Sequence, residues 1–70
     1  MAVEIFKTNI TDAVLAGELL RELDCLIPQS RINFDLEDCD KILRVEAESI
    51  PCQTIIDLMN KNGYQAEVLI

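Results

Sequence analysis

The chain has 70 residues, of which half are hydrophobic and 27% are charged. Its 13 acidic and 6 basic side chains give a net charge of −7, and it contains no histidine. A chain of this length forms a single two-layer core and has no room for a deep catalytic cleft. Its negative charge would repel a phosphate backbone or an anionic lipid surface, so we predict that it binds neither nucleic acid nor membranes.

Cysteine usage and hydropathy indicate where the protein resides. The longest uncharged apolar run, residues 13–17, is far shorter than the roughly 20 residues of a membrane helix. The N-terminus has neither the basic start nor the apolar run of a signal peptide, so we expect a soluble cytoplasmic protein with reduced thiols. Cys25, Cys39 and Cys52 are spaced by 14 and 13 residues, which is the pattern of neither a disulfide framework nor a CxxC site.

The first half of the chain predicts a strand, a helix and a second strand. Residues 3–10 are rich in β-branched and aromatic side chains, and their apolar positions fall on both parities, as is typical of a central strand. Thr11 and Asp12 are candidate helix caps, and a helix follows over residues 12–25. The leucines at helical spacing, which share one face of this amphipathic helix, are Leu15, Leu19, Leu23 and Leu26. After Pro28, residues 31–36 alternate between apolar and polar, which predicts a strand with one buried face.

The second half predicts a hairpin, a helix and a final strand. Residues 37–40 have polar turn chemistry, and residues 43–48 alternate again, so the two flanking strands form a β-hairpin. Pro51 opens a second helix, Gly63 closes it, and residues 65–70 form the last strand. The order βαββαβ over residues 1–70 predicts one α+β domain with the ferredoxin-like sandwich, in which two helices cover one face of a four-stranded antiparallel sheet.

Three segments, FKTNI at 6–10, DLEDCDKILRVEAE at 35–48 and IIDLMNKNGYQAEVL at 55–69, resemble the heavy-metal-associated, copper-chaperone-like domain family. The resemblance implies the same fold and a cytoplasmic carrier or transporter module that binds Cu(I) or another soft ion through the two cysteines of an MxCxxC loop. Here the methionine position of that loop is Ile10, and the cysteine positions are Asp12 and Leu15. Carboxylates are poor ligands for Cu(I), and leucine is no ligand at all. The resemblance therefore implies the scaffold without its metal site.

A metal site rebuilt from other residues is an alternative. In this topology the first βα loop, the hairpin turn and the turn before the last strand lie at one end of the sandwich. We therefore expect Asp12, Cys39 and Tyr64 to be neighbours, together with Asp38 and Asp40. One thiolate with several carboxylates is weak for Cu(I) and only fair for Zn(II), unless two copies of Cys39 meet across a dimer. We predict no cofactor, with copper or zinc at Cys39 and Asp12 as the alternative to an ordinary solvated turn.

The sequence contains no recognisable catalytic machinery. Histidine, a glycine-rich phosphate loop and an activated cysteine setting are all missing, so we predict that the chain is not an enzyme. Three separated cysteines are too few for an iron–sulfur cluster, which requires four ligands. Cys52 shares the apolar face of the second helix, so we expect it in the core as a small apolar residue. Antiparallel helices would bring Cys25 near Cys52, which leaves a redox pair as the alternative.

Leu15, at the second cysteine position, is the most informative residue. It either turns inward with Leu19 or contributes to an exposed apolar patch, and such patches mark contact surfaces. We therefore predict a metal-independent protein-interaction module that binds a partner protein or a second copy of itself through a surface of Ile10, Asp12, Leu15 and Tyr64. The alternatives are residual copper or zinc binding at the hairpin turn and, by analogy with the fold alone, a small-ligand regulatory module.

Overall fold

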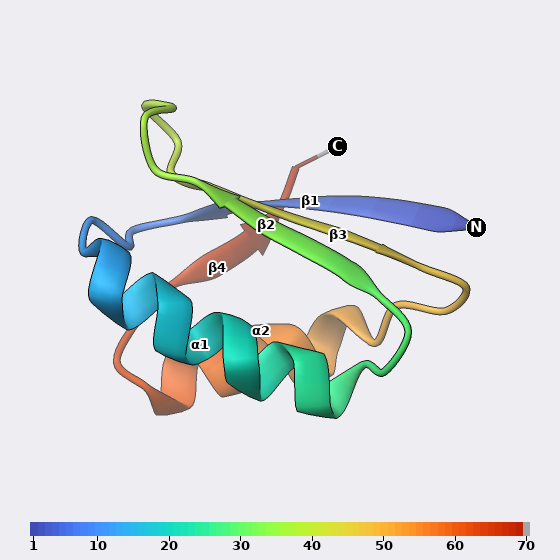
Figure 1. The fold of residues 1–70 in the computed structure, drawn as a ribbon. Helices are drawn as coiled ribbons and strands as arrows, with labels where there is room; N and C mark the ends of the chain where they lie inside the picture. The colour runs from blue at the N-terminus through green and yellow to red at the C-terminus, as the bar shows by residue number, and fades with distance from the viewer. Residues whose placement is uncertain (70) are drawn as a thin grey trace.

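One antiparallel sheet organises the molecule. The computed structural model describes residues 1–69. Its elements are β1 (Ala2–Thr8), α1 (Ala13–Leu26), β2 (Arg31–Asp35), β3 (Ile42–Ala47), α2 (Cys52–Lys61) and β4 (Ala66–Val68). The four strands lie in the order β2–β3–β1–β4, and every neighbouring pair is antiparallel. Both helices lie on the same face of the sheet (Figure 1). The predicted α+β ferredoxin-like fold is confirmed.

β1 is a central strand, as its apolar residues on both parities indicate, and it pairs with β3 on one side and β4 on the other. It ends at Thr8, although the sequence predicts a strand over residues 3–10. Beyond Thr8, backbone N–H groups donate to side-chain oxygens instead of to the carbonyls of a neighbouring strand. Asn9 Oδ1 accepts the Gln65 N–H at 2.8 Å, and the Ile10 N–H donates to Thr8 Oγ1 at 3.3 Å. These bonds turn the chain out of the sheet and toward α1.

The buried face of α1 differs from the face that its leucines predict. The buried residues of the helix and its C-cap are Ala16, Leu19, Leu23 and Ile27. Leu26, which the leucine spacing places on one face with Leu19 and Leu23, is 41% exposed, and Leu15, for which the sequence allows either orientation, is 38% exposed. Because successive residues turn by about 100°, these two positions lie together along one edge of the buried stripe. The expectation is corrected: α1 is rotated so that one row of its apolar residues borders solvent.

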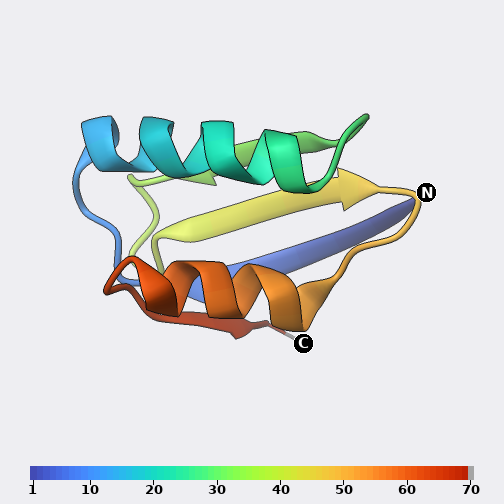
Figure 2. The ribbon, with the colours of Figure 1, turned by 90° about the horizontal axis from the view of Figure 1, so that it is seen from below.

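The core lies between the helices and the sheet and has two parts. The helices run antiparallel across the sheet, with α1 beside β2 and α2 beside β4 (Figure 2). The larger cluster comprises Phe6, Leu23, Ile27, Ile32, Leu43, Val45, Ala47 and Ile55. The smaller cluster comprises Ile10, Ala16, Leu19 and Met59, and it fills the end of the sandwich where α1 begins and α2 ends. This smaller cluster lies beneath the candidate site.

The remaining elements agree with the predicted ranges to within a few residues. α2 follows Pro51 directly, and the polar turn separates β2 from β3. β4 is shorter than the predicted strand over residues 65–70, and the last residue of that prediction, Ile70, lies outside the described residues. Neither helix of the described chain has the length and apolar character that crossing a bilayer requires.

Candidate interaction surface

Three connections meet at one end of the sandwich, as the topology predicts: the β1–α1 loop, the β2–β3 turn and the α2–β4 turn (Figure 1). The Thr8 N–H donates to the Asp40 carbonyl at 3.0 Å, which joins the end of β1 to the β2–β3 turn. The Gln65 N–H donates to Asn9 Oδ1, which joins the α2–β4 turn to the β1–α1 loop. Backbone and side-chain hydrogen bonds therefore hold this end of the molecule together.

Asp12 is the N-cap of α1. Its backbone is extended, with φ −103° and ψ 119°, and its Oδ1 accepts the N–H groups of Val14 at 2.8 Å and Leu15 at 3.3 Å. A helix N-terminus leaves four N–H groups without intrahelical partners, and this carboxylate satisfies two of them. Its negative charge also lies at the positive end of the helix dipole. At the position where the resembled family has its first cysteine, this chain has a helix cap.

The first turn of α1 presents apolar side chains to solvent. Val14 is 72% exposed, and of the two orientations considered for Leu15 the structure shows the outward one. Ile10 is fully buried in the smaller core cluster with Met59, because the bond of its amide to Thr8 directs the loop beneath α1. Its predicted place on the surface is corrected: Ile10 is a core residue of the cluster against which Tyr64 packs.

Tyr64 is positioned by the C-terminus of α2. Gly63 has φ +85°, in the left-handed region that glycine adopts without steric cost. The Gly63 N–H donates to the Asn60 carbonyl at 3.0 Å, and the Tyr64 N–H donates to the Met59 carbonyl at 2.9 Å. This pair of bonds is the Schellman motif, in which the residue after the glycine packs back on the helix. Tyr64 accordingly packs, half-buried, against the cluster that contains Met59 and Ile10.

Leu15 and Tyr64 line a groove on the outer surface between the helices. It has a volume of about 270 Å³, and its remaining lining residues are Glu18, Leu19, Arg21, Glu22 and Asn62. A second groove of about 480 Å³ shares Glu22 and is otherwise lined by Cys25, Leu26, Thr54, Asp57, Leu58 and Lys61. The exposed leucine edge of α1 therefore borders a hollow with apolar and charged side chains. Sequence reasoning missed this groove, since it depends on the rotation of α1.

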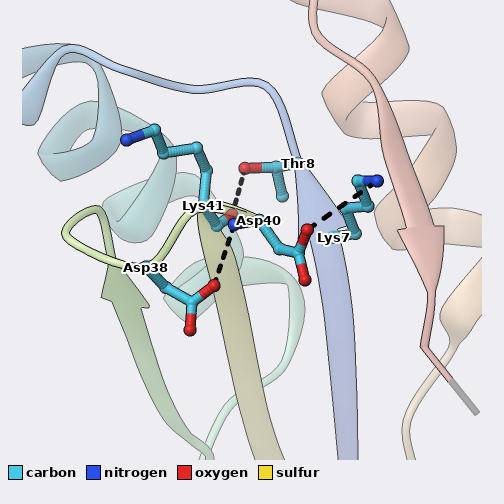
Figure 3. A network of polar contacts seen from close by, with 5 residues as sticks. All are labelled: Lys7, Thr8, Asp38, Asp40 and Lys41. Carbon is cyan, nitrogen blue, oxygen red and sulfur yellow. Dashed lines mark hydrogen bonds and ion pairs between the residues drawn. The ribbon is translucent and has the colours of Figure 1, made fainter.

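The β2–β3 turn brings together three potential metal ligands. The ligand atoms of Asp38, Cys39 and Asp40 lie within 4.8 Å of one another. Asp12, a predicted member of such a site, is not part of this group in residues 1–69, since its carboxylate caps α1. Both carboxylates of the turn have structural partners (Figure 3). Asp38 Oδ1 accepts the Asp40 N–H at 2.8 Å, and an Asp40 oxygen lies 3.7 Å from Lys7 Nζ.

The same turn is fixed at its base by bonds to β1 and within the hairpin. The Thr8 hydroxyl donates to the Lys41 carbonyl (Figure 3). Lys41 has a positive φ of 50°, and its Nζ donates to the Leu36 carbonyl at 2.9 Å. These contacts account for the turn geometry without a bound ion. One exposed thiolate and two carboxylates form a donor set that suits Zn(II) only moderately and Cu(I) poorly.

The three cysteines are free thiols in different environments. Cys39 is exposed at the turn, and exposed Cys25 lines the larger groove. Cys52 is half-buried at the start of α2, where it packs against the larger core cluster. Its burial raises the pKa of the Cys52 thiol, the negative charge of Glu4 raises it further, and a backbone hydrogen bond opposes both effects. Cys52 thus has the packing role expected of it, and its thiol resists ionisation.

Comparison with known proteins finds no protein-family model and no curated protein that matches the chain. The likeness to the heavy-metal-associated domain therefore remains a prediction from sequence. The structure establishes the ferredoxin-like architecture, the capping role of Asp12 and the exposure of Leu15. Those features define what this end of the molecule can bind.

Proposed function

We propose that the chain is a metal-independent protein-interaction module on a heavy-metal-associated-like scaffold, with neither a catalytic nor a carrier role. The proposal rests on what Asp12 and Leu15 do at the two positions where that family has its metal-binding cysteines. Asp12 is occupied as the cap of α1, and Leu15 is exposed beside a groove. One position stabilises the helix, and the other offers an apolar contact.

The composition of this surface supports protein recognition. Val14 and Leu15 are exposed, and the half-buried ring of Tyr64 lines the same groove as Leu15. An apolar centre with charged residues around it is the usual anatomy of a protein interface. Glu18 and Glu22 line this groove, and with a net charge of −7 the domain would attract a partner that presents basic residues. The free thiols are consistent with the reducing cytoplasm, where we place the module.

A paired substitution tests the proposal. Leu15 and Leu26 lie on the same helix with similar exposure, one near each end. The purified domain is used to capture proteins from cell extract, and captured partners are then titrated, with and without a metal chelator, against the wild type, Leu15→Asp and Leu26→Asp. We expect Leu15→Asp to weaken binding by about tenfold or more, since it places a charge at an apolar contact. Equal binding by both variants, or binding abolished by the chelator, would contradict the proposal.

The ligand cluster of the β2–β3 turn favours one other function, weak Zn(II) handling through Cys39. Reduced protein is titrated with Zn(II) and Cu(I) against a competing chelator, with Cys39→Ala as the test and Cys52→Ala as the control. If the domain is an interaction module, affinity is no tighter than roughly micromolar and is the same in all variants. Tight, stoichiometric binding that only Cys39→Ala abolishes would establish metal handling instead.

A further inference from the structure

Both helices cover one face of the sheet, and no other helix or strand of the described chain covers the opposite face (Figure 1). Along β1, Phe6 and Thr8 point to the helix side and are buried, whereas the intervening Lys7 is exposed. The strand register places the side chains opposite Lys7, Ile42 on β3 and Glu67 on β4, on the same open face. Antiparallel sheets commonly leave one face in water, and such a face is usually polar.

This open face carries four aliphatic side chains. Val3 is 48% exposed, Leu69 is 38% exposed, and Ile5 and Ile42 are half-buried. Ile5 and Leu69 are neighbours across the sheet, since the Leu69 N–H donates to the Ile5 carbonyl at 2.8 Å. Four aliphatic residues on a face without a covering layer suggest a contact surface.

The charges of this face differ from those of the rest of the molecule. Its strands carry three basic residues, Lys7, Arg31 and Arg44, and three acidic ones, Asp35, Glu46 and Glu67. The Asp40 carboxylate, which lies 3.7 Å from Lys7 Nζ, adds one negative charge at the edge of the face. Opposite charges on this face are neighbours. Arg31 lies across from Glu46 on the adjacent strand, Lys7 lies across from Glu67, and within β3 Arg44 donates to Glu46 at 3.1 Å. The other three basic and nine acidic side chains, which carry −6 of the net charge of −7, lie elsewhere.

This charge distribution favours a second copy of the chain as the partner that binds the open face. A second copy of the chain that approached through most of the remaining surface would meet charge of its own sign, which opposes association. Through the open sheet face it would meet aliphatic residues and a nearly balanced set of charges. We propose that two copies of this chain pack sheet against sheet in a symmetric dimer centred on Val3, Ile5, Ile42 and Leu69.

The dimer goes beyond the proposed function and does not depend on it. The helices and the groove beside Leu15 lie on the opposite side of the sheet (Figure 2), so both copies keep their partner-binding surfaces free. The assembled particle presents two such surfaces, which raises its avidity for a partner with two sites or on a repeated array.

Sedimentation velocity of the purified domain tests the dimer from about 10 μM to about 1 mM, the range of dissociation constants of weak dimers. We expect the wild type to reach the dimer mass. Ile5→Glu and Val3→Lys each add a charge to the centre of the interface and are expected to weaken association by about tenfold or more. Val14→Lys, on the helix side, is the matched control and keeps the dimer.

Circular dichroism melts show whether each variant is folded. If Ile5→Glu does not fold, Val3→Lys decides the test, because Val3 is an exposed position whose substitution leaves the core intact. A wild type that stays monomeric throughout the range overturns the proposal, as does a folded Val3→Lys that associates as tightly as the wild type. Leu15→Asp separates the two proposals, since it is expected to lose partner binding and keep the dimer.

Discussion

Replacing Asp12 with alanine tests whether this position stabilises α1. Asp12→Ala removes the acceptor of two hydrogen bonds, from Val14 at 2.8 Å and Leu15 at 3.3 Å. Loss of an N-cap costs about 1 kcal/mol. Loss of a negative charge at an exposed helix N-terminus costs roughly 0.3–1 kcal/mol more at low ionic strength. We therefore expect the free energy of unfolding to fall by about 1–2 kcal/mol.

Urea and thermal unfolding at neutral pH, followed by circular dichroism, measure this loss. For a domain of this size, about 1 kcal/mol lowers the Tm by roughly 4–8 °C. The urea m-value should not change, because the folded structure buries the same surface in the variant. Asp12→Asn is the matched control: it keeps an acceptor oxygen and removes the charge, so it should lose only the contribution from the helix dipole.

Two results would refute the reasoning about Asp12. The first is an Asp12→Ala variant as stable as the wild type, since the two cap bonds would then contribute nothing. The second is stabilisation of the wild type by Zn(II) that is lost in Asp12→Asn, because that dependence would make the carboxylate a metal ligand. A salt titration adds a check, since screening should remove the difference between wild type and Asp12→Asn.

Three other predictions concern the residues around the site. Gly63→Ala places a side chain on a residue with φ +85° and should lower the free energy of unfolding, measured with urea, by about 1 kcal/mol. Gly17→Ala, where the added methyl group meets open space on α1, should raise the same free energy by up to about 1 kcal/mol. Met59→Ala empties a fully buried position and should cost about 2–5 kcal/mol, whereas Met59→Leu should cost less than about 1.5 kcal/mol. Because burial raises the pKa of Cys52, iodoacetamide at about pH 8 should alkylate it more slowly than exposed Cys25, as read by mass spectrometry; equal rates would contradict this.

The raised pKa of Cys52 also predicts the direction of a pH effect on stability. Burial and the charge of Glu4 favour the neutral thiol in the folded protein. The folded protein keeps this advantage below the ordinary thiol pKa and loses it as the pH rises through the raised value. The contribution of this group to stability therefore declines only in the alkaline range.

The fold was predictable because each element has its own periodicity and end signal. Apolar residues on both parities identified β1 as central, and Gly63 marked the end of α2. The end of β1 was not predictable in the same way. It depends on Asn9 reaching the Gln65 amide, a contact between residues far apart in the sequence.

The candidate site was predictable only in part. Asp12 has the residue type and position of a cap, and the sequence named it as one. The orientation of Leu15 was left open because leucine spacing alone does not set the rotation of a helix. The two grooves, one bordered by Leu15 and the other by Leu26, follow from that rotation, and they therefore emerged only with the tertiary structure.

The exposure of Leu15 is a consequence of how the start of α1 packs. The Asp12 cap begins the helix at Ala13, which places Ala16 over the smaller core cluster with Ile10 and Met59. A small side chain at this contact lets the helix approach the loop closely. With Ala16 inward, the preceding position is turned by about 100° toward the outer edge. Core packing therefore exposes Leu15 at the position where the resembled family has a metal-binding cysteine.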